Sequence, residues 1–177
     1  MDATMTGQVV GSKLKWLWLA VLVIVLDLGT KALAAAMLTY GDPVPVAPMF
    51  NLTLLHNTGA AFSFMAEATG WQRWFFATLA LVVSVVLVYW LKNLKRHETW
   101  TAVAIVLILG GALGNVYDRV VHGYVVDFLH FHWQDWYFPA FNLADTAITI
   151  GAAMMILDMF RKPADSDGDA QRSDRLS

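Results

Sequence analysis

Cysteine is absent from the 177 residues of the chain. The chain therefore forms no disulfide, has no thiolate nucleophile and offers no zinc site with cysteine ligands. Charge is also scarce, because Asp, Glu, Lys and Arg together make up 15% of the residues and leave a formal net charge of -2. The basic residues fall in short clusters and not in one stripe, so the sequence argues against a nucleic-acid partner.

Common catalytic motifs are missing as well. HETWT, which starts at His97, lacks the second histidine that a zinc-protease helix carries four residues later. Neither a G-x-S-x-G elbow nor a glycine-rich phosphate loop before a lysine occurs. His130 and His132 form an HFH pair that needs a third convergent ligand to hold a metal ion, and beside aromatic residues such a pair is more often interfacial. The sequence therefore predicts no metal and no cofactor.

Apolar residues dominate what is present. They make up 58% of the chain, and the mean hydropathy is +0.52, whereas a soluble domain is roughly 45–50% apolar. Four apolar segments each reach the length of about 20 residues that a membrane-spanning helix needs. They cover residues 14–38, 71–91, 100–120 and 138–160. We therefore expect one all-α membrane domain with four transmembrane helices over residues 1–163, followed by a polar tail over residues 164–177 that is predicted to be disordered.

The first segment admits an alternative. Lys13 and Lys15 precede it, and residues 34–36 are small, as in a cleaved signal peptide. Asp27 and Lys31, however, lie four residues apart and so share one helical face. An ion pair inside the segment favours a retained helix in which both residues are structural.

Basic residues also predict the orientation, because lysine and arginine are enriched in cytoplasmic flanks. They precede the first segment, fill the connection between the second and third, and follow the fourth: Lys13, Lys15, Lys92, Lys95, Arg96, Arg161 and Lys162. The connections over residues 39–70 and 121–137 contain no lysine. Both termini should therefore face the cytoplasm, and these two connections should lie on the outer side.

The first outer connection should contain a strand. Three prolines, at positions 43, 45 and 48, oppose a helix there. Apolar and polar side chains alternate over residues 49–57 as in a short strand, and Asn57 and Gly59 belong to a turn signal. We expect a small sheet on the membrane surface. The second outer connection is rich in Phe, Trp and Tyr, which is typical of the membrane interface.

Acidic residues inside these apolar segments require an explanation. An ionised aspartate at the centre of a membrane helix costs about 2.5–3.5 kcal/mol, so it needs a partner, water or a proton. Asp27 has Lys31 for this purpose. Asp118 adjoins Arg119 in a pairing that is structural or catalytic, and Asp158 lies beside Arg161, where a structural role is expected.

Asp127 and Asp145 have no basic residue nearby in the sequence. Asp145 lies about seven residues into the fourth segment, which places it about 10 Å along a helix and still near the outer surface. Asp127 starts at the same surface, so a connection that folds back brings the carboxyls together. Two close carboxyls share a proton and can then act as base and acid in peptide hydrolysis. Spacing alone leaves a proton relay or an ion path open.

Five motif blocks occur in order along the chain. They are DLGTK from Asp27, HNTGAAF from His56, GNVYDR from Gly114, VVDF from Val125 and FNLADTAI from Phe141. In this order they resemble the motifs of bacterial lipoprotein signal peptidase, also called signal peptidase II. The blocks span nearly the whole membrane portion, and no motif position departs from the family pattern.

The resemblance implies an intramembrane aspartic endopeptidase of the bacterial inner membrane, with a small β-sheet and a short helix in the outer, periplasmic connection. It implies cleavage of prolipoproteins immediately before the diacylglyceryl-modified cysteine, contact with membrane lipid and inhibition by globomycin. It assigns catalysis to Asp127 and Asp145. It also implies that Asp27 and Lys31 support the fold and that six residues line or brace the site: Asn57, Gly59, Asn115, Asp118, Arg119 and Asn142.

Two other classes of protein stay open at this point. One is a small membrane transporter or proton-conducting subunit, in which Asp27, Lys31 and Asp145 carry protons. The other is a membrane chaperone or assembly factor without enzymatic activity. A proton path through the membrane has no evident use for Asp127 in a surface connection.

Overall fold

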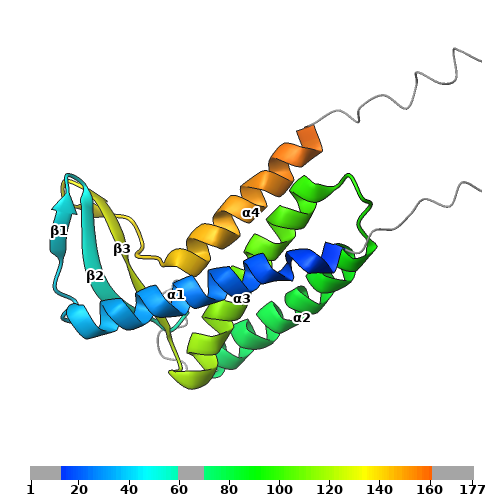
Figure 1. The fold of residues 1–177 in the computed structure, drawn as a ribbon. Helices are drawn as coiled ribbons and strands as arrows, with labels where there is room; N and C mark the ends of the chain where they lie inside the picture. Colours follow the sequence, from blue (N-terminus) through cyan, green and yellow to red (C-terminus); the bar gives the residue numbers. More distant parts are fainter. Residues whose placement is uncertain (1–12, 60–69, 161–177) are drawn as a thin grey trace, which may run out of the picture.

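The computed structural model describes residues 13–59 and 70–160 of the chain. Four helices in it are long and apolar enough to cross a membrane, as the sequence predicted. They are α1 (Leu17–Met37), which continues the short 3-10 helix η1 (Lys13–Trp16), α2 (Trp71–Asn93), α3 (Thr99–Val121) and α4 (Leu143–Phe160). Figure 1 shows these helices as one bundle with a small sheet at one end.

Helix α3 is the centre of the bundle, because it contacts α1, α2 and α4. Glycines on α3 let the neighbouring backbones come close. A Cβ atom at Gly110 would lie 2.8 Å from the carbonyl oxygen of Ala20, and one at Gly111 would collide with the carbonyl oxygen of Ala144. Such small residues are typical of helix interfaces in membranes, where close van der Waals packing drives association.

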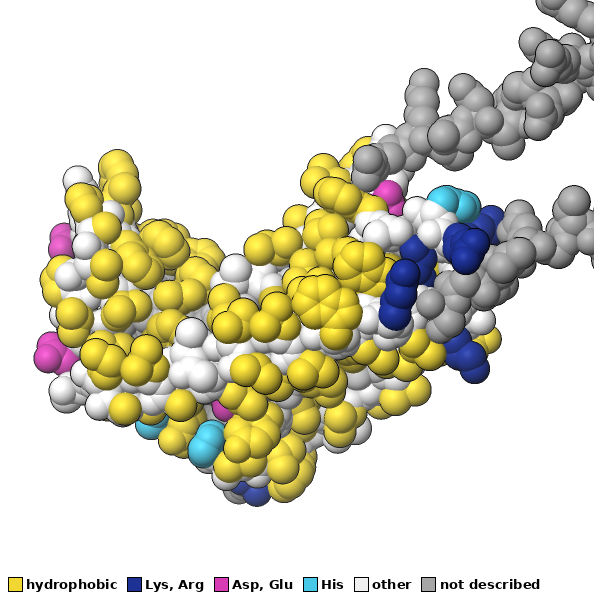
Figure 2. Space-filling view, viewed as in Figure 1, with side chains coloured by type: hydrophobic (Ala, Val, Ile, Leu, Met, Phe, Trp, Pro, Cys, Tyr) yellow, Lys and Arg dark blue, Asp and Glu magenta, His cyan; other side chains and the backbone are white. Residues whose placement is uncertain are grey.

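The outward faces of the helices stay apolar. Val82, Val85 and Val86 of α2 are 57%, 70% and 57% exposed. Figure 2 shows hydrophobic side chains over much of the bundle and a cluster of lysine and arginine side chains at the end far from the sheet. Exposed apolar faces on helices with internally satisfied backbones suit contact with lipid.

The sheet contains four antiparallel strands in the order β1 (Val44–Ala47), β2 (Phe50–Asn57), β3 (Val125–Trp133) and β4 (Trp136–Tyr137). Strand β2 confirms the strand expected over residues 49–57. The expected small sheet is confirmed, and the second outer connection, which the sequence predicted only as an interfacial aromatic segment, also contributes to it with β3 and β4. In the β2–β3 register Leu55 lies opposite Asp127, so pairing with β2 fixes the position of Asp127.

Helix α4 begins at Leu143 and not near residue 138 as the sequence predicted. The reason is that the residues before it bond to β3. Phe138 N donates to Phe131 O at 2.9 Å, and Phe141 N donates to Leu129 O at 3.0 Å. These backbone groups are therefore used by the sheet. Asp145 consequently lies in the first turn of α4, closer to the end of the helix than the sequence suggested.

The start of α1, the α2–α3 connection and the end of α4 lie at the end of the bundle opposite the sheet (Figure 1). The tail expected over residues 164–177 lies outside the described residues. For the short helix expected in the first outer connection, residues 39–59 contain strands and turns and no helix, and residues 60–69 lie outside the described part.

Candidate active site

Asn142 and Asp145 form a reciprocal cap at the start of α4. Asp145 N donates to Asn142 Oδ1 at 2.9 Å, and Asn142 N donates to Asp145 Oδ2 at 3.3 Å. The segment Asn-Leu-Ala-Asp thus uses the spacing of a capping box, in which two side chains satisfy helix N–H groups that have no partner within the helix. The cap fixes the direction of the Asp145 carboxyl.

The Asn142 side chain also reaches the second carboxyl. Its Nδ2 donates to Asp127 Oδ1 at 2.7 Å and lies 3.3 Å from Val126 O and 3.2 Å from Asn115 Oδ1. An amide nitrogen has two hydrogens, so the short bond to Asp127 is the principal one. One fully buried asparagine therefore connects the two aspartates that the sequence singled out.

Asp127 is 2% exposed. Burial and, to a smaller extent, the negative charge of Asp145 raise the pKa of its carboxyl to about 7, while hydrogen bonds from Asn57 and Asn142 act in the opposite direction. Near neutral pH this carboxyl is therefore protonated for a substantial part of the time.

Asp145 is half-buried and accepts hydrogen bonds on both oxygens. Asn115 Nδ2 donates to Oδ1 at 2.8 Å, and the backbone N–H of Asn142 reaches Oδ2. Asn115 comes from α3, so side chains from α3, α4 and β3 converge on the pair. The carboxyls thus differ in environment, which is the condition for unequal roles in acid–base chemistry.

Lys31 lies next to this pair and contacts three polar side chains. Its Nζ lies 2.8 Å from Asp27 Oδ2, 2.9 Å from Asp118 Oδ2 and 2.9 Å from Asn115 Oδ1. The predicted Asp27–Lys31 pair is therefore confirmed. Lys31 also holds Asn115, which in turn holds Asp145.

The two acidic partners of Lys31 bind the backbone near the site. Asp27 Oδ1 accepts from Ala144 N at 2.9 Å, and Asp118 Oδ2 accepts from Val126 N at 3.1 Å. These bonds tie α1 to the start of α4 and α3 to β3. The sequence reading that paired Asp118 with its neighbour Arg119 is wrong, because the Asp118 carboxylate forms its ion pair with Lys31.

Arg119 lies near the aspartates without a salt bridge to either one in the described part of the chain. It interacts electrostatically with Asp145 and Asp127, its Nη1 donates to Asn115 O at 3.3 Å, and its guanidinium lies 5.5 Å from the Phe76 ring centre. Its buried Nε has no hydrogen-bond partner. The guanidinium therefore retains donors for a ligand.

Asn57 and Gly59 form a tight turn at the end of β2. Gly59 N donates to Asn57 Oδ1 at 2.9 Å, which leaves the Asn57 amide to bond Asp127. Gly59 has a φ of +85°, and a Cβ atom there would lie 2.7 Å from the Phe76 ring. Glycine is thus required both by the backbone conformation and by space. The rest of this motif lies outside the described residues.

A cleft of about 280 Å³ opens onto Asp127. Sequence reasoning missed several residues that line it, because no motif or charge marks them: Tyr40, Leu55, Pro139 and Ala140. Asp158, by contrast, lies far along α4 and accepts a hydrogen bond from Thr101 at 2.8 Å. Its expected partner Arg161 lies outside the described residues.

Four apolar helices and two aspartates whose carboxyls both bond to Asn142 define a multi-pass membrane protein with a two-aspartate site. Residues 19–161 match the model of a protein family described as signal peptidase (SPase) II. The chain belongs to the signal peptidase II family and is a peptidase of that family, which confirms the resemblance seen in the five motif blocks.

Individual relatives agree with this assignment. A lipoprotein signal peptidase of Pseudomonas paraeruginosa (strain DSM 24068 / PA7) is 62% identical over 151 residues, which cover 84% of this chain and 89% of the relative. A lipoprotein signal peptidase of Pseudomonas syringae pv. tomato (strain ATCC BAA-871 / DC3000) is 55% identical over 162 residues, which cover 90% of this chain and 93% of the relative. A bacterial membrane enzyme solved by the in meso method at 1.9 Å resolution is 33% identical, covers 84% of this chain and 94% of its own, and superposes with a TM-score of 0.74.

Proposed function

We propose that this protein is an aspartic endopeptidase that removes the signal peptide from prolipoproteins by cutting immediately before the diacylglyceryl-modified cysteine. The observation that carries the proposal is the position of Asn142 between the two aspartates: its side-chain Nδ2 donates to the Asp127 carboxylate, and its backbone N–H donates to the Asp145 carboxylate. Both carboxyls therefore bond to one residue at the sheet end of a membrane bundle (Figure 1). Family membership supports the same peptidase reaction.

In the proposed reaction the pair holds one proton. The ionised carboxylate removes a proton from a water molecule, and the oxygen of this water attacks the scissile carbonyl carbon. At the same time the protonated carboxyl donates its proton to the carbonyl oxygen. The carboxyl that took the proton from water then donates it to the leaving nitrogen as the C–N bond breaks, and a gem-diol hydroxyl returns a proton to the other carboxylate, so the pair again holds one proton. One water is consumed, and a free carboxyl and a free amine are produced. The raised pKa of Asp127 supports this residue as the carrier of the proton at rest.

The neighbouring side chains have positioning roles in this scheme. Asn57 and Asn142 orient Asp127, and Asn115 orients Asp145. Arg119 offers free donors near both aspartates and is proposed to bind the substrate backbone or the developing oxyanion. Asp118 and Gly59 support the strands that carry these groups.

The position of the pair suits a lipidated substrate. The acyl chains of a diacylglyceryl-cysteine stay in the bilayer, so the bond before this cysteine lies at the membrane surface. Asp145 in the first turn of α4 and Asp127 on the sheet lie at the end of the membrane helices. We place this end on the periplasmic side of the inner membrane and both termini in the cytoplasm, because the basic clusters lie at the opposite end. Globomycin is proposed to inhibit by occupying the cleft beside Asp127.

The test is cleavage of a synthetic diacylglyceryl-modified prolipoprotein peptide by the purified protein in detergent. We expect cleavage before the lipidated cysteine, no cleavage of the peptide with an unmodified cysteine, and unchanged rates in the presence of a chelator. Asp127→Asn and Asp145→Asn should each abolish cleavage. Asp158→Asn is the matched control and should cleave like the wild type, because it removes a carboxylate far from the site.

Two results would refute the proposal. Full activity of either site variant would rule out the two-aspartate mechanism. Loss of wild-type activity in the presence of the chelator would indicate a metal-dependent mechanism instead. The unfolding temperature of each variant should be measured alongside, so that an inactive variant that remains folded is distinguished from one that has unfolded.

A further inference from the structure

A second cavity, of about 410 Å³, lies between α1, the end of α3 and the strands β2 and β3. It shares His56 with the cleft at Asp127 but is otherwise lined by different residues. One wall is apolar and comes from the membrane helix α1, with Leu28, Ala32 and Ala35. The other wall is aromatic and basic. The buried ion pair of Lys31 and Asp118 closes one end.

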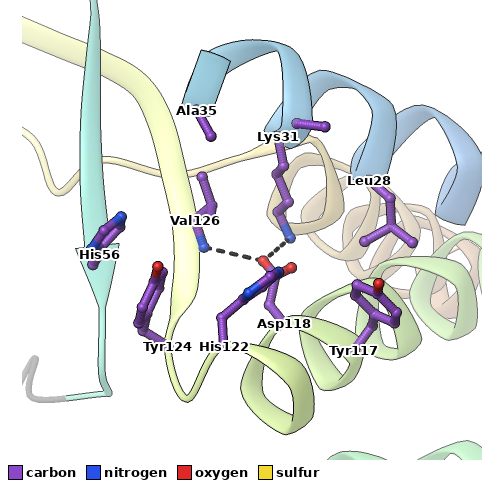
Figure 3. Close-up of a pocket in the computed structure, with 10 residues that line it drawn as sticks. Leu28, Lys31, Ala35, His56, Tyr117, Asp118, His122, Tyr124 and Val126 are labelled. Atoms are coloured by element: carbon purple, nitrogen blue, oxygen red, sulfur yellow. Dashed lines mark hydrogen bonds and ion pairs between the residues drawn. The ribbon is translucent and has the colours of Figure 1, made fainter. Parts of the chain in front are cut away.

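The aromatic wall is a continuous stack. The His56 and Tyr124 rings are stacked with centroids 3.9 Å apart, and the His122 ring is stacked on Tyr124 at 5.9 Å. Tyr117 meets His122 edge-on at 6.3 Å. Figure 3 shows His56, Tyr124 and His122 in a row from β2 to the end of α3. The row sets two imidazoles on either side of one tyrosine, at the exposed rim of the cavity.

These imidazoles are available for a ligand. Among the described residues neither His56 nor His122 forms a hydrogen bond or an ion pair. The Asp118 carboxylate at the buried end already has partners, because it forms an ion pair with Lys31 and accepts a hydrogen bond from the backbone N–H of Val126. The lining therefore presents imidazole and phenol donors and no free carboxylate. Such a set of groups favours an anion.

Burial lowers the pKa of His56, and the charge of the nearby His122 lowers it further. The other titratable groups that face the two rings are Tyr40, whose ring is tilted against His56 at 4.8 Å, then Tyr117, Tyr124 and the Lys31–Asp118 pair. An anion bound at the edges of these rings would act in the opposite direction on His56 and favour its protonated form.

We propose that this cavity binds an anionic glycerophospholipid, with the phosphodiester bound by His56 and His122 and an acyl chain lying against Leu28, Ala32 and Ala35 of α1. The apolar wall is part of a membrane-spanning helix, whereas the donors lie at the sheet end of that helix, where lipid headgroups lie. A free phosphate would contact only the imidazole and phenol donors and would leave the apolar wall from α1 without a partner. The inference does not rest on the proposed peptidase reaction.

The first test follows histidine titration in the full chain by NMR, in maltoside micelles that contain no phosphate. Phosphatidylglycerol is added, with diacylglycerol as the matched compound without phosphate and inorganic phosphate as the matched anion without chains. We expect phosphatidylglycerol alone to raise the pKa of both His56 and His122. His97 in the α2–α3 connection and His130 on β3 are internal controls and should shift less, because general surface charge acts on every histidine.

The second test measures retention of phosphatidylglycerol by native mass spectrometry. The double variant His56→Gln/His122→Gln should bind it about tenfold more weakly, because two charge-assisted hydrogen bonds are lost. The variant His97→Gln should bind like the wild type. The single variant His122→Gln changes one exposed side chain only and should give an intermediate loss, so the test does not depend on the double variant folding normally.

Three outcomes of the titration would overturn the proposal. Equal shifts with inorganic phosphate would show a general phosphate site, equal shifts with diacylglycerol would show an apolar site without headgroup recognition, and equal shifts at His97 and His130 would show only the surface charge of the micelle. Unchanged lipid retention by the folded double variant would also refute it.

Discussion

The Asn142 side chain donates a hydrogen bond of 2.7 Å to the carboxylate of Asp127. The same asparagine caps the helix that carries Asp145. One residue therefore has a structural role and a positioning role that can be separated by substitution. Its side-chain nitrogen bonds the Asp127 carboxylate, whereas its side-chain oxygen accepts from the backbone N–H of Asp145, so it links the strand that carries Asp127 to the helix that carries Asp145.

We predict that Asn142→Ser keeps the helix cap and loses the hydrogen bond to Asp127. Serine caps helices about as well as asparagine but cannot reach Asp127 with a donor of the same length. The value of kcat/KM should fall about 100-fold, with an unfolding temperature near that of the wild type. Asn142→Ala should lose both activity and stability. Wild-type kcat/KM in the serine variant would contradict the positioning role.

The activity should depend on pH through Asp127. Its pKa is raised to about 7 by burial and by the charge of Asp145. Above this pH the pair loses its shared proton, so kcat/KM for the lipidated peptide should decline as the pH rises through about 7. The measurement is a pH profile at low substrate concentration. A rate that stays flat from pH 6 to pH 9 would show that the shared proton is not needed.

Stability should depend on pH in the same direction. The folded-state pKa of Asp127 lies above the unfolded value of about 3.9, so the folded state binds more protons between these values and stability falls as the pH rises from about 4 to about 7. Asp127→Asn removes a buried charge and should therefore be more stable than the wild type at pH 8, by on the order of 2–4 kcal/mol. The difference should shrink at pH 4. Thermal unfolding of both proteins at the two pH values checks it, with Asp158→Asn as the control.

Lys31→Met should destabilise the fold strongly. The substitution leaves Asp27 and Asp118 buried without a countercharge, and breaking one member of a buried ion pair typically costs about 3–5 kcal/mol. Lys92→Met changes an exposed lysine at the end of α2 and should have little effect. Adding Asp118→Asn to Lys31→Met should recover part of the loss, because it removes one of the unpaired charges. Denaturant unfolding of the three variants and the wild type measures this, and a silent Lys31→Met would show that the network contributes little.

Gly111→Ala should weaken the contact between α3 and α4. A Cβ atom there would collide with the backbone of Ala144, two residues after Asn142, so we expect lower stability and lower kcat. Gly29→Ala is the matched control. Gly29 lies within α1 and a Cβ atom there meets nothing within 4 Å, so alanine should be neutral or slightly stabilising. Equal unfolding temperatures of the two variants would contradict close packing at Gly111.

The sequence was most informative where local patterns decide structure. Runs of apolar residues fixed the number and approximate bounds of the helices, because burial in lipid depends on length and hydropathy alone. The four-residue spacing of Asp27 and Lys31 predicted their ion pair correctly. The same local reasoning failed for Asp118, because its true partner is 87 positions away in the sequence on another helix.

The start of α4 shows the same limit. Residues 138–142 read as the beginning of an apolar helix, yet their backbone groups bond to β3, and nothing local in the sequence reveals a strand partner. The second outer connection likewise read as an interfacial aromatic loop and proved to be part of the sheet. Strand pairing between distant segments depends on tertiary contacts, so local patterns in a single sequence do not specify it.

The sequence by itself therefore determined the solvent in which this chain folds, its four helices, its family and the two aspartates that stand without neighbouring countercharges. Only the tertiary structure decided how those aspartates meet: β2 sets the register of Asp127, Asn142 links it to Asp145, and Lys31 organises the groups behind them. The physical reason is the separation along the chain over which each interaction acts. Hydropathy and helical spacing act over a few residues along the chain, whereas hydrogen bonds to buried carboxyls join groups that only folding brings within 3 Å of one another.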